Sequence, residues 1–316
     1  MNAILIIFFL SYGLYSFFNN FKFWIIYTTF MLFYYFIMKK TQRIEKSINI
    51  SSKINHTTWS NTHEPDTYIT VKLDITKILP YLKKKSEEIN AKITPTIFTI
   101  KLMAILLKKY PEINGFIKFG IYEPKDSIDI CCIVQVGEGN ELANHTIISC
   151  EKKSFKEITK NLTDSVRILR ERKNKDQNTK MNMYKLVPTF LTGPIVQIMC
   201  YLSSIGFKVK PIGLKKYEFG SLVITSIGSL GIEHSYAPIP PFTFVPLLLT
   251  LCKKYDVNKK LENGDIETRT FLKLNFTVDY RFFNLRTAIS LIKDIHIYGE
   301  DPVKFEDECK KYSPEI

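Results

Sequence analysis

The residues with the most evident chemical potential lie near the C-terminus, in the segment 277–284, which reads TVDYRFFN. It follows a run typical of a β-strand, residues 271–276, and a run typical of a helix begins at Asn284. A tyrosine, Tyr280, stands in the middle. Its phenol has an ordinary pKa of about 10, so it is a poor general base at neutral pH, but it can donate a hydrogen bond to a carbonyl or an oxyanion. The alternative is an aromatic side chain that fills an interface beside the phenylalanines that follow it.

A histidine would be a better base, and the chain has five, all outside this segment: His56, His63, His145, His234 and His296. His234 follows a glycine-containing turn at residues 228–231 and could approach the end of the strand that holds Thr225. We therefore treat His234 as a candidate substitute base, with a surface or structural role as the alternative. The sequence has no serine–histidine–aspartate order, no zinc-binding spacing and no glycine-rich phosphate loop.

Several elements must position these residues. Residues 68–73 alternate apolar and polar side chains, which predicts a half-buried strand. Thr94 is a plausible N-cap with Pro95 in the first helical position, and residues 97–107 are apolar on most sides, which predicts a deeply buried helix. Pro111 then ends this helix, because proline cannot continue the hydrogen-bond ladder.

Five segments together resemble one family. They occur in its order over about residues 66–302 and lie at residues 68–76, 93–101, 109–114, 222–231 and 277–284. The chain resembles the catalytic domain of the 2-oxoacid dehydrogenase acyltransferases and the related chloramphenicol acetyltransferases. The resemblance implies an α/β fold, a mixed sheet flanked by helices, over residues 67–316.

The resemblance also implies roles for single residues. Tyr280 falls where the family has its catalytic histidine, and Asn284 falls where it has an aspartate. Thr225 falls where a neighbouring subunit supplies the hydroxyl that binds the oxyanion, although an ordinary strand threonine is the alternative. Asp279 and Arg281 keep the family's residues, with structural roles through ion pairing.

Two functions follow from the resemblance. The first is an acyltransferase that moves an acyl group from acyl-CoA to an unknown acceptor, with coenzyme A as substrate and a homotrimer as the assembly. The second is a catalytically inactive scaffold subunit of a membrane assembly, because a missing base removes about 10²–10⁴-fold in rate. The sequence contains no lipoyl domain, so a core subunit of a dehydrogenase complex is not expected, and no metal is expected.

Composition limits the partners. The chain has 316 residues and a net charge of +13, which favours anionic partners such as a membrane surface or a nucleotide-bearing cofactor. Nucleic acid is not expected, because the lysines are spread along the chain and no binding motif is present. The six cysteines have neither metal-binding nor disulfide spacing, so buried free thiols are expected.

The N-terminus predicts a membrane anchor at residues 1–40, with a polar linker at 41–66. Residues 3–38 are almost wholly apolar, too long for one straight span of a core about 30 Å thick, and the break is expected at residues 19–22. Two spans in a hairpin, or one span after an interfacial helix, fit this pattern; a cleaved signal peptide is the rival. The sequence therefore predicts an integral membrane protein with lipids as partners. Basic residues follow the second apolar segment, at Lys39, Lys40 and Arg43, and they predict that the domain lies on the cytosolic side.

A further apolar stretch, residues 186–207, interrupts the family pattern. Its prolines, Pro188 and Pro194, are expected to break the early turns of any helix there. A helix that lies on a membrane surface or on the domain is therefore favoured over a third span.

Overall fold

The computed structural model describes residues 21–45, 66–118, 120–135, 142–172, 189–208, 216–240, 242–260, 265–282 and 284–313. The chain divides into two compact units, Met1–Lys53 and Ile54–Ile316, and each is considered by itself. The boundaries that the sequence predicts for anchor, linker and domain stay predictions.

The first unit contains helix α2, Phe21–Glu45. It continues to Glu45, into residues expected to be linker. Large apolar side chains such as Ile26 and Phe36 are about two-thirds exposed, at 70% and 65%. Among the described helices, however, none is both long and apolar enough to cross a bilayer, so the predicted transmembrane spans are not found there. The other predicted segment, residues 3–18, lies outside the described residues.

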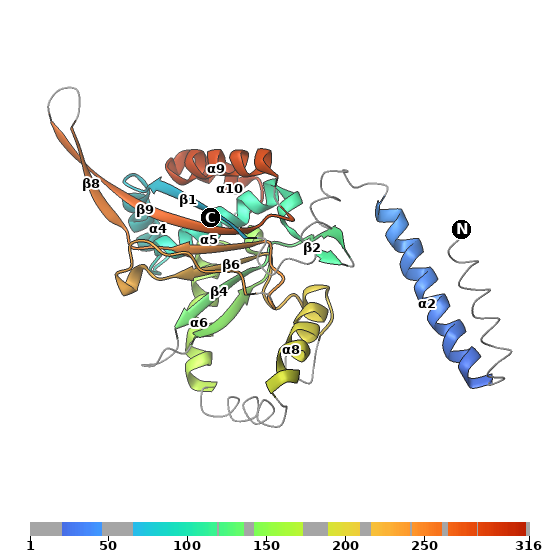
Figure 1. Cartoon of the computed structure of the whole chain (residues 1–316). Helices are drawn as coiled ribbons and strands as arrows, with labels where there is room; N and C mark the ends of the chain where they lie inside the picture. The colour runs from blue at the N-terminus through green and yellow to red at the C-terminus, as the bar shows by residue number, and fades with distance from the viewer. Residues whose placement is uncertain are drawn as a thin grey trace. The chain divides into compact units, whose positions relative to one another are not determined.

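A mixed sheet of seven strands forms the second unit (Figure 1). The order is β1-β9-β7-β6-β4-β5, and β8 pairs with the first half of β9. Strands β4, β6 and β7 run parallel, whereas β1, β5 and β8 join antiparallel to their neighbours. The bounds are β1 Asp66–Asp74, β4 Ile130–Gln135, β5 Leu142–Ile147, β6 Leu222–Ser226, β7 Leu247–Leu251, β8 Tyr255–Lys260 and β9 Ile266–Asp279. Strands β2, Gly115–Lys118, and β3, Ile121–Pro124, form a separate hairpin.

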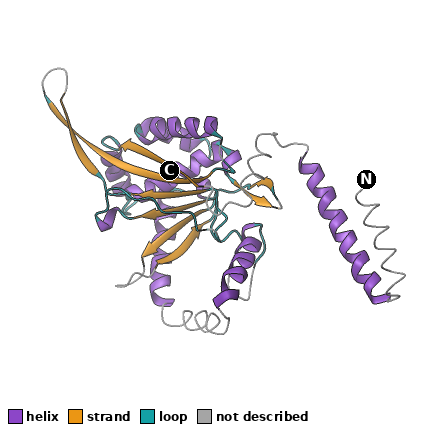
Figure 2. Ribbon diagram, viewed as in Figure 1, coloured by secondary structure: helices purple, strands orange, loops and turns teal. Residues whose placement is uncertain are grey.

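Helices cover one face of this sheet (Figure 2). They are α4 Ile78–Glu88, α5 Pro95–Lys109, α6 Phe155–Arg172, α9 Leu285–Gly299 and α10 Pro302–Lys310, with short 3-10 turns at Pro111–Ile113, Cys150–Lys152 and Gly228–Leu230. The mixed sheet flanked by helices that the sequence predicted is confirmed.

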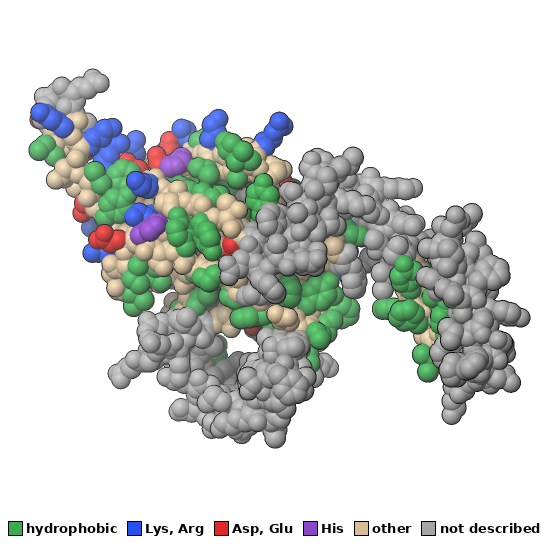
Figure 3. All heavy atoms as spheres, in the orientation of Figure 1, with side chains coloured by type: hydrophobic (Ala, Val, Ile, Leu, Met, Phe, Trp, Pro, Cys, Tyr) green, Lys and Arg blue, Asp and Glu red, His purple; other side chains and the backbone are tan. Residues whose placement is uncertain are grey.

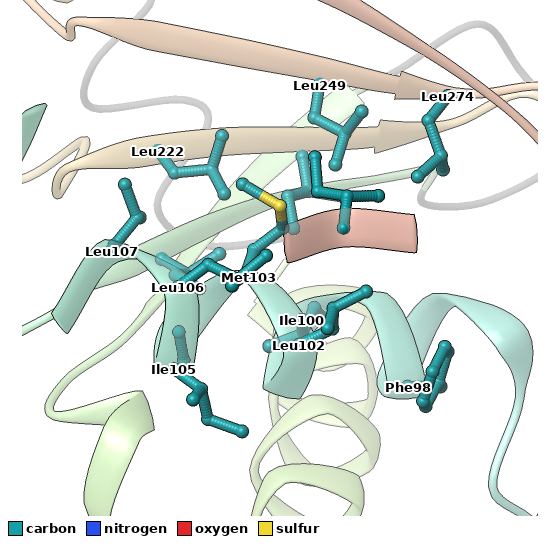
Figure 4. Close-up of a cluster of buried hydrophobic side chains, with 14 of the residues drawn as sticks. Phe98, Ile100, Leu102, Met103, Ile105, Leu106, Leu107, Leu222, Leu249 and Leu274 are labelled. Atoms are coloured by element: carbon teal, nitrogen blue, oxygen red, sulfur yellow. The ribbon is translucent and has the colours of Figure 1, made fainter. Parts of the chain in front are cut away.

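Helix α5 is the centre of the core (Figure 4). The Thr94 hydroxyl accepts a hydrogen bond from the Ile97 amide at 3.3 Å, and Pro95 occupies the first turn, as predicted. Residues 97–107 are all buried, because neighbouring helices cover the side of α5 that does not face the sheet. Tyr110 ends the helix before Pro111.

The apolar insertion forms helix α8, Thr189–Ser204. The prediction that proline breaks its early turns is wrong, since the helix runs without interruption through Gly193 and Pro194. Pro194 is the sixth residue of the helix, so its missing amide removes one backbone hydrogen bond, to the Phe190 carbonyl, without ending the helix. Pro188 lies outside the described residues. Near its C-terminal end Ile198 is 60% exposed, and Phe207 just beyond is 58% exposed.

The other face of the sheet differs in chemistry. Strand residues that alternate with the core residues point to this face, and a small apolar cluster that includes Cys131, Val223 and Leu248 covers part of it. Next to that cluster the face is polar. Basic side chains gather elsewhere, along the rim near α9 and the β8–β9 hairpin (Figure 3). All six cysteines are free and buried, as predicted.

Candidate functional site

A row of polar residues crosses the face of the sheet that lies opposite the helices. Thr225 in β6 pairs with Thr250 in β7, Thr250 pairs with Asn275 in β9, and Asn275 pairs with Thr70 in β1. Paired residues on adjacent strands point to the same face, so these four side chains form one row. Thr250 is 1% exposed, and its hydroxyl has no hydrogen-bond partner among the described residues. Thr225 is half-buried at the carboxyl end of β6.

Asn275 holds this row in a fixed arrangement. It is fully buried, and its Nδ2 donates to the Ser235 carbonyl at 2.8 Å, while its Oδ1 accepts from the Thr70 hydroxyl at 2.9 Å. These two bonds determine which way the amide points. The segment that covers the row is further tied to β9 by Thr277, whose hydroxyl donates to the Ala237 carbonyl at 2.6 Å.

His234 lies at this row, as the sequence allowed. Its Nδ1 is 3.3 Å from Asn275 Nδ2, and Cys252 Sγ lies at the same distance from that nitrogen. A neutral imidazole that accepts at Nδ1 carries its proton on Nε2. A His234 that accepts from the Asn275 amide therefore has a donor at Nε2, which suits a hydrogen-bonding role better than that of a base.

Tyr280 directly follows the C-terminal end of β9. The strand ends at Asp279, whose carboxylate forms a two-pronged ion pair with Arg281: Nε is 3.0 Å from both carboxylate oxygens and Nη2 is 2.6 Å from Oδ2. The Asp279 side chain is 6% exposed, so the pair is largely buried and sets the turn in which Tyr280 sits, 41% exposed. This geometry agrees with the structural role that the resemblance implied for Asp279 and Arg281.

Asn284 is the N-cap of α9. Its Oδ1 accepts a hydrogen bond from the Thr287 amide at 2.8 Å, and its backbone is extended, as in most N-caps. The side chain thus has a local structural function.

Helix α9 is in turn fixed to the end of α5. The Tyr110 hydroxyl donates to Asp294 Oδ2 at 2.7 Å, and Lys109 Nζ is 2.7 Å from the same oxygen. Burial, together with the hydrogen bond to Asp294, raises the pKa of Tyr110 to about 12. This network anchors the helix that begins directly after the Tyr280 turn.

One chain does not bring Thr225 and Tyr280 together. Thr225 is in register with Thr250 and Asn275, and Tyr280 follows Asn275 by five residues. An extended strand rises about 3.3 Å per residue and neighbouring strands are about 4.8 Å apart, so the two residues lie roughly 15–20 Å apart. A single reaction that used both side chains would need them from different copies of the chain.

Sequence reasoning missed Thr250 and Asn275. Each lies on a strand at a position that points away from the helices, and a polar residue within an otherwise apolar strand was the available signal. Only the pairing of β6, β7 and β9 shows that these polar positions meet.

With this geometry in hand, the chain can be compared with known proteins. The family model of the 2-oxoacid dehydrogenases acyltransferase (catalytic domain) matches residues 40–182, which is less than half of the chain and ends before Thr225 and Tyr280. No curated protein sequence matches significantly.

Solved structures extend the likeness. A probable dihydrolipoamide acetyltransferase from Listeria monocytogenes is 18% identical, with 85% of this chain and 94% of that one covered and a TM-score of 0.55. The dihydrolipoamide acetyltransferase of Azotobacter vinelandii is 16% identical, with 82% and 89% covered and a TM-score of 0.55. A truncated catalytic core of the 2-oxoacid dehydrogenase multienzyme complex from Thermoplasma acidophilum is 19% identical, with 79% and 93% covered and a TM-score of 0.53.

The fold and the matched region define the class: this is a protein with an acyltransferase-like catalytic domain. It is similar to the 2-oxoacid dehydrogenase acyltransferases over most of its length, and at these identities the likeness establishes the fold.

Proposed function

We propose that this chain transfers an acyl group from acyl-CoA to a second acceptor, with Thr225 as a hydrogen-bond donor to the oxyanion and Tyr280 in the place of a histidine. The observation that carries the proposal is the acetyltransferase fold with a hydroxyl, Thr225, at the carboxyl end of the central parallel strand β6. Donors held in place for a developing oxyanion typically contribute about 10²–10³-fold in rate.

The spacing around Tyr280 supports this assignment. In the Azotobacter vinelandii enzyme, a serine, a histidine and an asparagine have been investigated for their role in the catalytic mechanism, and that histidine and asparagine are four residues apart. Tyr280 and Asn284 have the same spacing. An asparagine at this position is therefore compatible with an active enzyme, and the replacement that weakens catalysis is that of imidazole by phenol.

A catalytically inactive scaffold subunit is the second candidate. It is favoured by the chemistry at Tyr280, because a phenol is a poor base at neutral pH, and by the contact of His234 Nδ1 with the Asn275 amide, which occupies that nitrogen. Both candidates use the same fold, and a catalytic assay distinguishes them.

The experiment measures thiol release from short-chain and long-chain acyl-CoA by four forms: the native chain, Thr225→Ala, Tyr280→Phe and Tyr280→His. Turnover in the native chain that falls about 10²-fold or more in Thr225→Ala establishes the enzyme. Turnover that appears only in Tyr280→His, with a gain of about 10²-fold or more, establishes the inactive scaffold. Failure of every form to bind coenzyme A contradicts both uses of the fold.

We also propose that the chain works as a membrane-attached protein with its catalytic domain on the cytosolic side. The support is the set of exposed aromatic and aliphatic side chains of α2 and the basic residues Lys39, Lys40 and Arg43 near its end. Extraction of cell membranes with alkaline carbonate tests this: the intact chain is expected in the pellet, and a chain without residues 1–45 in the supernatant. An intact chain that appears in the supernatant contradicts the attachment.

Assembly into a homo-oligomer, a trimer by resemblance, completes the proposal. It is supported by the separation of Thr225 from Tyr280 in one chain and by the likeness to the cubic core of the pyruvate dehydrogenase multienzyme complex. Sedimentation at several protein concentrations measures the assembly, and a monomer at all of them contradicts it.

A further inference from the structure

Two lysine side chains lie against the ring of Tyr217, in the turn before β6. Lys125 Nζ is 5.0 Å and Lys216 Nζ is 4.9 Å from the ring centroid. Tyr217 has a left-handed backbone, with φ of 54°, which few residues other than glycine adopt. Its amide donates to the Ser203 carbonyl at 2.9 Å, and its ring contacts Phe116 with centroids 5.9 Å apart. The turn therefore fixes an aromatic ring with two ammonium groups beside it.

These ammonium groups are not neutralised by a direct ion pair. Within the described ranges, neither Lys125 nor Lys216 pairs with a carboxylate; Lys125 Nζ instead donates to the Gly220 carbonyl at 2.6 Å. Lys125 is half-buried, and burial lowers its pKa to about 8, an effect that the Asp129 carboxylate partly opposes. A half-buried cation whose nearest partners are a carbonyl and an aromatic face is incompletely compensated, so an anion at this place would be stabilised.

Two buried polar side chains nearby also lack partners. Asn114 Oδ1 and Ser221 Oγ, on residues 2% and 0% exposed, have no hydrogen-bond partner among the residues that the structure describes. Both side chains lie among the loops packed around Lys125. Asn114 Nδ2 donates to the Lys125 carbonyl at 2.8 Å, and the Ser221 amide donates to the Asp129 carbonyl at 2.7 Å. Because buried polar groups nearly always have a partner, these two atoms show that the polar groups packed around Lys125 are incompletely satisfied.

Lys125 and Lys216 lie at the same end of the sheet as Tyr280. Lys125 directly follows β3, and in β3 the ring of Tyr122 meets that of Phe282 edge-on, with centroids 6.1 Å apart. Phe282 is two residues after Tyr280. The strands agree with this placement, because β9 ends at the edge where the parallel strands β4, β6 and β7 begin.

We propose that Lys125 and Lys216, held beside Tyr217, bind the phosphate groups of the acyl donor. The inference rests on the proposed acyl transfer from acyl-CoA and adds the site for the anionic half of that substrate. Lysine binds phosphate as a compact point charge. With the phosphates at this edge, the thioester arm extends toward Tyr280. A phospholipid headgroup offers the same phosphate chemistry, and the experiment separates the two sources.

The experiment uses the full chain in four forms: the native chain, Lys125→Met, Lys216→Glu and a matched control, Lys310→Met. Lys310 is an exposed lysine in α10, 3.6 Å from Asp307. Calorimetry measures binding of coenzyme A and of pantetheine, which carries the thiol arm without the nucleotide phosphates. Co-sedimentation measures binding to vesicles of neutral phosphatidylcholine, with and without anionic phosphatidylglycerol. Near-UV circular dichroism checks the fold of each form, and Lys216→Glu, at an exposed position, keeps the test informative if Lys125→Met misfolds.

The expected result is that coenzyme A affinity falls at least about tenfold in both lysine variants and stays within about twofold in Lys310→Met, while pantetheine affinity is unchanged. Equal coenzyme A affinity in the native chain and the lysine variants overturns the site even if acyl transfer is real. If coenzyme A does not bind but anionic vesicles do, in a manner that depends on Lys125 and Lys216, the phosphate site stands and the acyl donor assigned to it is overturned. Binding of neither overturns both.

Discussion

At the scale of single residues, Asn284 has a structural function that does not depend on any catalytic role. Its side chain caps α9, and asparagine and aspartate are equally good N-caps. An exchange between the two residues therefore leaves the helix intact and changes mainly the charge beside Tyr280. Tyr280 lies in the turn before this helix and is 41% exposed, so we expect its substitution to act on chemistry more than on stability.

We expect Asn284→Ala to lower the free energy of unfolding by about 1 kcal/mol, because the Thr287 amide loses its partner, and Asn284→Asp to leave it within about 0.5 kcal/mol. Urea denaturation of the two variants measures the difference. Equal losses in both variants would mean that the cap contributes nothing to stability.

Lys125 predicts a pH dependence of stability. Its folded pKa of about 8 lies below its ordinary value of 10.5, so between these values the unfolded chain holds a proton that the folded chain has released. The free energy of unfolding therefore rises with pH across this window, by about 2 kcal/mol between pH 8 and pH 9.5 from this group.

Denaturation of the native chain and of Lys125→Met at both pH values isolates this contribution, since other groups titrate in both forms. The native chain is expected to gain stability relative to the variant as the pH rises. A difference that does not change with pH contradicts the lowered pKa.

At the scale of elements, close approaches of the backbone decide where the strands begin and end. Gly220 precedes β6 with φ of 65°, and a Cβ there would meet the Asp129 carbonyl oxygen at 2.3 Å. Gly231 has a similar φ of 80°, but a Cβ there would meet nothing within 4 Å. The sequence predicted the turn around Gly231 from its glycines, and the structure confirms it. It did not point to Gly220, because the contact that excludes a side chain comes from a distant segment.

This pair allows conformational strain to be separated from a clash. Gly231→Ala is expected to reduce stability by about 1–2 kcal/mol, the cost of a left-handed backbone for a residue with a Cβ. Gly220→Ala is expected to cost about 3 kcal/mol or more, because the backbone of Asp129 must also move. Thermal and urea unfolding of both variants measure the two losses, and similar values would show that the clash is relieved at little cost.

At the scale of the whole molecule, the positions of Thr225 and Tyr280 are the decisive feature. The sequence places both in one chain, and the resemblance assigns them to one reaction. The sheet puts them near opposite ends of the β6–β7–β9 arrangement. If both act in one site, that site lies between copies.

Complementation tests this arrangement. Thr225→Ala and Tyr280→Phe chains, each with reduced turnover, are mixed, unfolded and refolded together. Because sites form between neighbouring copies, about a quarter of them would contain both native side chains, and about a quarter of native turnover is expected to return. Mixtures no more active than the better single variant would place both residues in one chain's site or leave one of them without a role.

The amino-acid sequence by itself determined the elements whose causes are local. Three features depend only on neighbours within a few residues, and each is found as expected. They are the alternation of apolar and polar residues in β1, the cap and proline that begin α5, and the proline that ends α5. The sequence also indicated the fold, because five short segments in a fixed order are enough to identify a known architecture.

Only the tertiary structure decided what these elements bring together. Segments that are far apart in the chain pair in the sheet and create three features. These are the polar row from Thr225 to Thr70, the packing of loops around Lys125, and the distance between Thr225 and Tyr280. No local pattern encodes that pairing, since strand register depends on which apolar faces can be buried together, and this is a property of the whole sheet.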